Sequence, residues 1–282
     1  MKFAVSNIAW SPLERIDAYN ILKRYGVTGL EIAPGLFFHA AKNAFEPSDE
    51  IAKAALNEIS SMGMQLVSMQ SLLFGIEGAA IFEGKEALER FNEGMLQAIN
   101  LASRFAIPNL VFGSPKQRVI PEEIEYAKAE AFAVNVFRDL GKHAAEAGTV
   151  IAMEFNPSAY GTNFLNDIQQ TIRFVEKVDH PAIKLNFDVG AMYMNNQFGE
   201  IESFIKRANQ LISHVHISEP NLDPAPADVE QTVRILKALN TIGYDRWVSI
   251  EMKPAPSEEL AVLESSVSKL VQAVRVSKVV RR

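Results

Sequence analysis

The sequence predicts an α/β protein, a single (β/α)8 TIM barrel in which eight parallel strands alternate with eight helices. Two observations carry this prediction. Eight short runs rich in Val, Ile and Phe recur along the 282 residues, and each is followed by a stretch with apolar residues at helical spacing. No Pro-, Gly- or Ser-rich linker interrupts this alternation. We therefore expect one domain over residues 1–282, because α/β barrels commonly run to about 250 residues as one domain.

The predicted strands are apolar almost throughout, as in Val150-Ile151-Ala152-Met153. Continuous apolar runs are typical of parallel strands that are buried on both faces. In chain order the predicted strands are Phe3–Ile8, Gly29–Ile32, Gln65–Met69, Asn109–Phe112, Val150–Glu154, Ile183–Phe187, Ile212–Ile217 and Trp247–Glu251.

The predicted helices lie between these strands and have apolar residues three and four positions apart. Glycine follows four of them, as at Tyr25-Gly26 and Met62-Gly63, where a helix C-terminus favours it. In chain order they are Leu13–Tyr25, Asp49–Met62, Lys85–Phe105, Glu122–Ala147, Asp167–Val178, Glu200–Asn209, Asp228–Ile242 and Ser257–Val276.

The main alternative fold is a doubly wound open sheet. Such a sheet typically has a glycine-rich phosphate-binding turn after its first strand. Here that turn reads Ala9-Trp10-Ser11-Pro12 and contains no glycine. The sequence therefore favours the barrel.

Composition excludes several classes of protein. The chain is 48% hydrophobic and 22% charged, which is too apolar for a disordered protein. It has no cysteine, and so neither disulfides nor thiolate-bound zinc. The net charge of -6 disfavours a nucleic-acid partner. No apolar run approaches the length of a signal peptide core or of a membrane span, so we expect a cytoplasmic protein without a membrane partner.

Polar and ionisable side chains gather at the carboxyl ends of the predicted strands. In a barrel these ends form one mouth, which carries the active site. Charged residues are almost never fully buried unless they are paired or bind a metal. The gathered residues are Glu31, Gln70, Ser71, Lys116, Arg118, Glu154, Asn156, Asn186, Asp188, His214, His216, Glu219, Glu251 and Lys253.

Four of these residues fall on consecutive strands and form a candidate metal site: Glu154, Asp188, His216 and Glu251. Three carboxylates and one imidazole make a mainly hard donor set, which suits one divalent ion, Mn²⁺, Mg²⁺ or Co²⁺, with Zn²⁺ also compatible. The alternative is a set of ordinary ion pairs between these carboxylates and Lys184, Lys253 or Arg118.

At these residues the sequence resembles the xylose isomerase-like TIM barrel superfamily, and within it the sugar isomerase/epimerase branch that includes D-tagatose 3-epimerase. The resemblance follows the strand order along the whole chain. Its elements are Gly29-Leu30-Glu31-Ile32, Phe112-Gly113-Ser114-Pro115-Lys116-Gln117-Arg118, Met153-Glu154-Phe155-Asn156-Pro157, Asn186-Phe187-Asp188-Val189-Gly190, His214-Val215-His216-Ile217-Ser218-Glu219 and Ser249-Ile250-Glu251.

The resemblance implies one divalent metal held by Glu154, Asp188, His216 and Glu251. In similar sequences the metal-binding histidine is followed by an x-x-Asp or x-x-Glu pattern, which here selects His216 over His214. We expect His214 one layer deeper, either as a core histidine or as a residue that orients a carboxylate.

The implied activity is isomerisation or epimerisation of a sugar or sugar phosphate by proton transfer next to a ketose carbonyl, through an enediolate. Glu154 and Glu251 are the predicted catalytic acid and base, because the strands of Asp188 and His216 separate them around the ring. A bound metal would stabilise the enediolate.

The predicted substrate contacts are Glu31, Arg118, Asn156, Lys253 and Glu219. Arg118, with Lys116, is expected either to hold a substrate phosphate or carboxylate or to lie in a solvated loop. Glu31 is expected to contact a substrate hydroxyl or a metal-bound water. Aromatic residues on the predicted mouth loops, either for sugar stacking or as lids, are Trp10, Phe38, Phe74 and Tyr160.

The sequence departs from the family at Ala191, where many relatives have a substrate-contacting histidine. This weakens the transfer of any one ketohexose specificity. The first alternative is a lyase on the same barrel, such as an inosose or sugar dehydratase. An endonuclease IV-like AP endonuclease is disfavoured, because five histidines in the whole chain are too few for its three-zinc cluster. A barrel that binds sugar without turnover is disfavoured by the presence of both glutamates. Related barrels also suggest a homo-oligomer.

Overall fold

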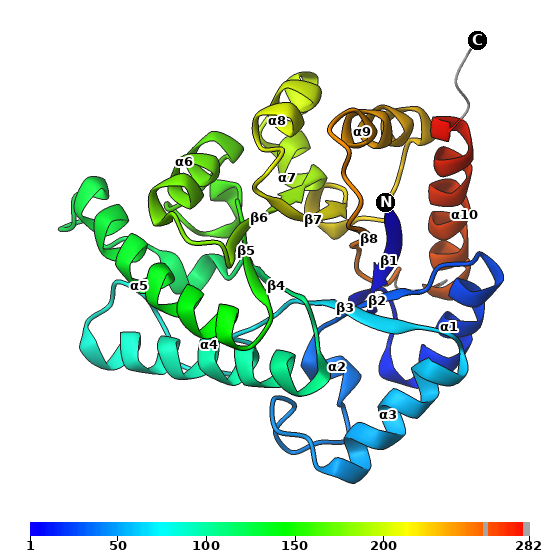
Figure 1. Ribbon diagram of the computed structural model, residues 1–282, viewed down its shortest axis with the longest axis horizontal. Coiled ribbons are helices and arrows are strands. Elements are labelled where there is room, and N and C mark those ends of the chain that lie inside the picture. Colours follow the sequence, from blue (N-terminus) through cyan, green and yellow to red (C-terminus); the bar gives the residue numbers. More distant parts are fainter. Residues whose placement is uncertain (256–258, 279–282) are drawn as a thin grey trace.

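A computed structural model describes residues 1–255 and 259–278. Its eight strands pair in parallel in chain order and close into a barrel between the first strand and the last, which confirms the predicted fold class (Figure 1). The strands are β1 (Lys2–Ser6), β2 (Gly29–Ile32), β3 (Gln65–Met69), β4 (Asn109–Phe112), β5 (Val150–Glu154), β6 (Ile183–Asp188), β7 (Ile212–Ile217) and β8 (Trp247–Ile250).

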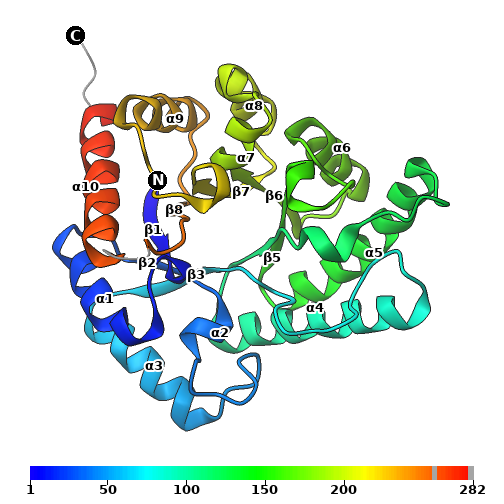
Figure 2. The same cartoon turned by 180° about the vertical axis from the view of Figure 1, so that it is seen from behind.

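Helices surround the strands on all sides in both ribbon views (Figures 1 and 2). The eight predicted helices correspond to α1 (Arg15–Arg24), α3 (Asp49–Ser61), α4 (Lys85–Phe105), α5 (Tyr126–Glu146), α6 (Ile168–Val178), α8 (Ile201–Arg207), α9 (Val229–Thr241) and α10 (Glu259–Lys278). Two short helices, α2 (Pro34–Phe37) and α7 (Val189–Met194), were not predicted, and they follow β2 and β6 directly. The predicted start of the last helix, Ser257, lies outside the described residues.

Local sequence signals account for where several helices begin and end. The side chains of Ser48, Asp167 and Asp228 each accept a backbone N–H bond at the start of α3, α6 and α9. After α5 and α9 the backbone turns through Gly148 and Gly243, at φ of +72° and +68°, a region that favours glycine. The glycines predicted to end these helices therefore adopt the positive φ with which helices commonly end.

The first strand is shorter than predicted. The prediction extended it to Ile8, whereas the chain leaves β1 after Ser6 and enters a one-turn helix over Asn7–Ala9. Asn7 explains this departure, because its buried side chain accepts a bond from Ala33 N at 2.7 Å and draws the chain toward the end of β2.

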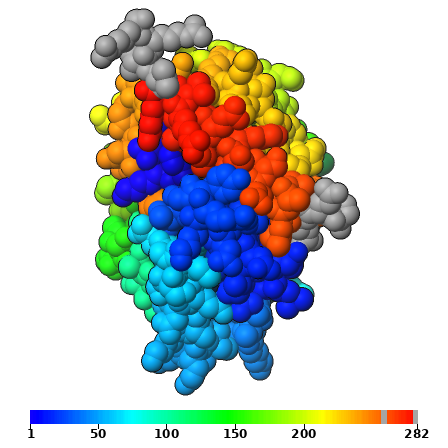
Figure 3. All heavy atoms as spheres, turned by 90° about the vertical axis from the view of Figure 1, so that its right-hand side faces the viewer, coloured from blue at the N-terminus to red at the C-terminus, as the bar shows by residue number. Residues whose placement is uncertain are grey.

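Two segments far apart in the sequence lie side by side and complete the helical ring. The last helix, α10, packs against α1 and α9, and Figure 3 shows it lying over the N-terminal part of the chain. No helix among residues 1–255 and 259–278 is long and apolar enough to cross a membrane.

Strand register positions the polar residues at one level of the barrel. Glu154 on β5 is paired with Asn186 on β6, and Asp188 on β6 is paired with His216 on β7. His216 is in turn paired with Ser249, two residues before Glu251. The carboxyl ends of β5 to β8 therefore place their polar side chains within reach of one another.

Candidate metal centre and active site

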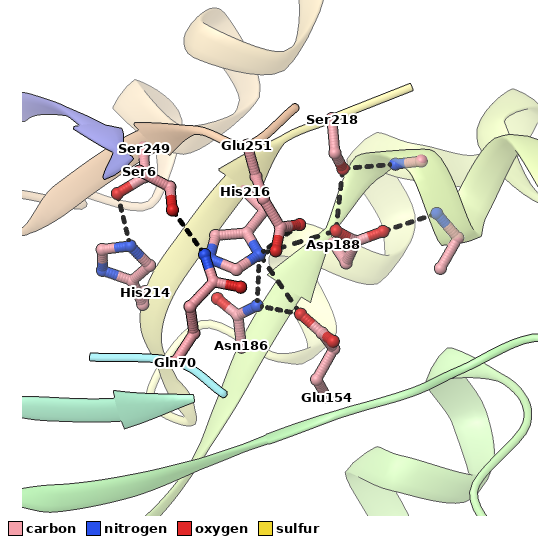
Figure 4. A network of polar contacts seen from close by, with 12 residues as sticks. Ser6, Gln70, Glu154, Asn186, Asp188, His214, His216, Ser218, Ser249 and Glu251 are labelled. Atoms are coloured by element: carbon pink, nitrogen blue, oxygen red, sulfur yellow. Dashed lines mark hydrogen bonds and ion pairs between the residues drawn. The ribbon is translucent and has the colours of Figure 1, made fainter. Parts of the chain in front are cut away.

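The four predicted metal ligands meet at the mouth of the barrel. One donor atom from each of Glu154, Asp188, His216 and Glu251 lies within 4.8 Å of the other three. His216 Nδ1 is 3.0 Å from Glu251 Oε2, 3.2 Å from Glu154 Oε1 and 3.7 Å from Asp188 Oδ2. Figure 4 shows the three carboxylates on one side of the imidazole ring.

The chemistry of this cluster fits a divalent cation. Within the part of the chain that the structure describes, no lysine or arginine forms an ion pair with the three carboxylates, so the ion-pair alternative has no support there. Burial raises the pKa of Glu251 to about 7, and the carboxylates of Glu154 and Asp188 add to this rise against the opposing effect of His216. A bound cation would offset this concentration of negative charge.

Neighbouring side chains hold the carboxylates in place. Asn186 Nδ2 donates to Glu154 Oε1 at 2.6 Å, and Asn156 Nδ2 donates to Glu154 Oε2 at 3.2 Å. Asp188 accepts from Ser218 Oγ at 2.7 Å and from the backbone N–H of Ala191 at 2.5 Å. Bonds of this kind orient the ligand side chains of metal sites in proteins.

Ser218 had no role assigned from the sequence. It lies two residues after His216, where strand alternation would place both side chains on the same face. This two-residue spacing was the signal in the sequence that could have placed Ser218 at the site.

Glu31 lies beneath the candidate metal centre and does not face the open mouth. Its side chain is fully buried, and its two oxygens lie 3.0 Å from His216 Nε2 and 2.9 Å from His214 Nε2. Gln70 Nε2 donates to Glu31 Oε1 at 3.0 Å. Burial opposes ionisation of Glu31, but the two histidines outweigh it and lower its pKa. Glu31 is thus placed to orient His216 rather than to touch a substrate hydroxyl.

His214 contacts Glu31 at the same depth in the barrel, below the carboxylate cluster. Its Nε2 is 2.8 Å from Ser249 Oγ as well as 2.9 Å from Glu31, and Figure 4 shows it away from the carboxylate cluster. The structure therefore places His214 one layer deeper than His216, next to a carboxylate.

Arg118 occupies a place that differs from the expected one. Its side chain is fully buried, with Nη1 donating to the carbonyl oxygen of Glu154 and Nη2 to Asn156 Oδ1, both at 2.8 Å. Because Nη2 occupies Asn156 Oδ1, the amide Nδ2 of Asn156 turns toward Glu154. The guanidinium of Arg118 thus binds groups at the end of β5. Its burial agrees with neither expected position, at the open mouth to hold a substrate anion or in a solvated loop.

A cavity of about 680 Å³ opens above the candidate metal centre. The carboxylates of Glu154, Asp188 and Glu251 line it, and so do the predicted contacts Asn156 and Glu219. Lys253 and Lys116 are exposed and do not line it. Lys253 instead meets the β7 loop through its backbone, where its N–H donates to Leu222 O.

The four predicted mouth aromatics divide into two pairs. Phe74 and Tyr160 line the cavity, whereas Trp10 and Phe38 are buried at 3% and 1% exposure. Trp10 packs edge-on against Tyr19, and Phe38 against Phe37, so both belong to the core.

Comparison with known proteins places the chain in a family. A sequence model described as "Xylose isomerase-like TIM barrel" matches residues 19–269, and the chain belongs to that family. D-psicose 3-epimerase of Ruminiclostridium cellulolyticum is 28% identical over 119 residues, a match that spans 42% of this chain and 40% of that protein.

Solved structures of sugar epimerases have the same fold. D-psicose 3-epimerase from Clostridium cellulolyticum H10, solved with D-tagatose, superposes with a TM-score of 0.76 at 17% identity, covering 99% of this chain and 98% of that one. The 3-keto-D-glucoside 4-epimerase of E. coli gives a TM-score of 0.76 at 17% identity, covering 96% and 99%.

Proposed function

We propose that this protein is a divalent-metal-dependent isomerase or epimerase of neutral sugars, acting by proton transfer at the carbon next to a ketose carbonyl. The observation that carries the proposal is the presence of two glutamates, Glu154 and Glu251, that face one cavity from either side of Asp188 and His216. The epimerase names of the relatives support the same reaction class.

Glu154, Asp188, His216 and Glu251 would hold the metal. When bound, a divalent cation supplies electrostatic stabilisation of the negative charge that develops on the ketose oxygens. The residues themselves would hold and move the protons. Asn156 and Asn186 hold the Glu154 carboxylate as the group that accepts a proton. Glu251, on the other side of Asp188 and His216, would be the second group that exchanges a proton with the substrate.

The stereochemical outcome depends on where the second proton goes. One glutamate removes a proton from one face of the carbon next to the carbonyl, which leaves an enediolate. Return of a proton by the other glutamate to the opposite face of C3 inverts that carbon. In a 1,2-isomerase the proton would instead be taken from C1 and returned to C2 while the C1 hydroxyl proton moves to O2, which converts ketose to aldose. The roles of Glu154 and Glu251 exchange in the reverse direction, as microscopic reversibility requires.

The charge of the cavity favours a neutral sugar over a sugar phosphate. Among the described residues that line it there is no lysine, arginine or histidine, but there are five acidic residues: Glu77, Glu154, Asp188, Glu219 and Glu251. A phosphate group needs cations or backbone N–H groups directed at it. Arg118, the expected partner for such a group, is already engaged by Glu154 and Asn156.

Single substitutions test the assignment of the two glutamates. Glu154→Gln and Glu251→Gln keep the side-chain shape but remove the titrating group. We expect each to abolish turnover of ketoses and to lower bound metal in elemental analysis, while the exposed control Glu123→Gln keeps both. Full turnover in either glutamine variant would contradict the proposal. Release of water from an inosose or ketose by the native protein, without epimerised product, would replace it with a dehydratase.

A further inference from the structure

The cavity is larger than a simple sugar needs. Its volume of about 680 Å³ falls inside the range of roughly 300–1,000 Å³ that holds drug-sized ligands. A ketohexose, with only about a dozen non-hydrogen atoms, is smaller than the drug-sized ligands that such pockets hold. Space therefore remains beyond a sugar whose carbonyl lies at Glu154 and Glu251.

The walls of this extra space differ in chemistry from its floor. The floor carries the carboxylates of the metal centre, whereas the loops beyond the strand ends contribute large apolar side chains. These apolar residues are Leu73, Phe74, Ile76, Pro115 and Leu222. A polar floor with an apolar outer wall suits a ligand that is itself divided into a sugar and an apolar part.

Phe74 is the most exposed of these residues, and its loop holds it there. Its side chain is 76% exposed. The flanking residues Leu73 and Ile76 pack on Gly94 of α4, where a Cβ atom would lie 2.7 Å and 2.3 Å from their methyl carbons. The two flanking side chains thus anchor the loop, and the ring between them remains in solvent. Covering an exposed aromatic ring with apolar surface is favourable.

Two further loops, those after β5 and β7, also face the cavity. The hydroxyl of Tyr160 accepts a bond from Asn221 N at 3.2 Å, and the carbonyl of Leu222 accepts one from Lys253 N at 2.9 Å. These bonds connect the loops that follow β5, β7 and β8. Leu222 and Tyr160 are therefore held in place at the edge of the cavity. Apolar surface is thus presented to the cavity from loops on different strands.

We infer that the substrate is a neutral keto-sugar glycoside with an apolar, preferably aromatic, aglycone that packs on Phe74, Ile76 and Leu222. This inference rests on the proposed function, since it places the sugar carbonyl at the metal centre. It adds that the aglycone contributes to binding and that a free ketose fills only the polar part of the cavity.

The test compares three glycosides that share one reacting sugar: methyl, phenyl and glucosyl 3-keto-β-D-glucopyranosides. Deuterium entry from solvent at the carbons next to the ketone is followed by NMR, with the rate without enzyme subtracted. We expect kcat/KM to be at least about tenfold higher for the phenyl than for the methyl compound, as burial of an aromatic group predicts. Phe74→Ala should lower that ratio, and Phe74→Tyr should retain it.

The matched control is Phe132→Ala, because Phe132 is also exposed, at 43%, but lies on α5 and does not line this cavity. It should leave the phenyl-to-methyl ratio unchanged. Equal rates for methyl and phenyl compounds would overturn the inference while leaving the proposed function intact. A faster glucosyl compound would also overturn it, since the outer wall would then be a sugar subsite. Absence of exchange in these compounds and in all free ketoses would overturn both.

Discussion

Glu31 lies 3.0 Å from Nε2 of His216, on the side of the ring opposite the three carboxylates that Nδ1 faces. A carboxylate at Nε2 favours the N–H there, so that Nδ1 is the nitrogen that can coordinate a metal. Because Gln70 and His214 also hold Glu31, the orientation of His216 is set from beneath by a fully buried network.

Glu31→Gln should weaken metal binding although Glu31 is not one of the four proposed ligands. An amide accepts less strongly than a carboxylate and can also present N–H to the imidazole. We expect Mn²⁺ affinity to fall by roughly 10- to 100-fold in calorimetric titration, the range for changes of this kind. The control is Glu58→Gln, which loses an ion pair with Arg15 far from the site and should bind Mn²⁺ normally. Unchanged affinity in Glu31→Gln would exclude an orienting role.

Metal affinity should fall as the pH is lowered through about 7. A metal must displace the proton from Glu251, whose pKa burial raises to about 7, and from His216, whose pKa Glu251 and Glu31 raise against the opposing effect of burial. Metal binding at neutral pH should therefore release protons, which titration in buffers of different ionisation enthalpy measures. Proton-independent binding between pH 5.5 and 8 would contradict these assignments.

The stability of the metal-free protein should decrease as the pH rises, whereas metal affinity should increase. A carboxyl group with a raised pKa retains its proton when folded but loses it above pH 4.5 when unfolded. The contribution of Glu251 is thus fully present below that pH and lost as the pH rises through about 7. The increase in Tm on adding Mn²⁺ should accordingly be larger at pH 8 than at pH 5.5, and Glu251→Gln should reduce this difference.

Gly113→Ala should damage the site with little effect on stability. A Cβ atom there would lie 2.6 Å from Glu154 Oε2, the movable end of a side chain, so the carboxylate must shift. We expect at least about tenfold lower activity, since small displacements of catalytic groups are costly, and a free energy of unfolding within about 1 kcal/mol of native. Gly199→Ala, which meets no atom within 4 Å, is the matched control and should retain activity.

Arg118→Lys should reduce stability, because lysine cannot donate to the carbonyl of Glu154 and the amide of Asn156 with the same fork geometry. We expect a loss of about 2 kcal/mol in urea unfolding, in the range for buried bonds from charged groups. Arg90→Lys, on an exposed arginine of α4, should leave stability nearly unchanged. Unchanged stability in Arg118→Lys, with a specific loss of affinity for sugar phosphates, would restore Arg118 as a substrate contact.

The barrel and the convergence of the four candidate metal ligands could be predicted because both depend on strand order. Each apolar run identifies a strand, and the carboxyl ends of parallel strands meet at one mouth, so Glu154, Asp188, His216 and Glu251 are expected at the same end of the barrel. The short helices α2 and α7 could not be predicted in the same way, because one turn or two give too little periodicity.

The position of Glu31 depends on a detail that the sequence does not reveal. The pairing of β2 with β3 shifts register between Leu30 and Glu31, which changes how the end of β2 meets its neighbour. The burial of Arg118 likewise depends on acceptors 36 and 38 residues later in the chain, the Glu154 carbonyl and Asn156 Oδ1. From sequence alone, a charged residue in a loop is predicted to be exposed, because its distant hydrogen-bond partners are not known.

The most direct test of the central claim is solvent deuterium entry at the carbon next to the carbonyl of a neutral ketose, measured by NMR on metal-stripped and Mn²⁺-reloaded protein. The account predicts exchange in the reloaded protein, little in the stripped protein, and none above background in Glu154→Gln or Glu251→Gln. Exchange that is equally fast in stripped protein, or that persists in both glutamine variants, would contradict a metal-dependent proton transfer between these two glutamates.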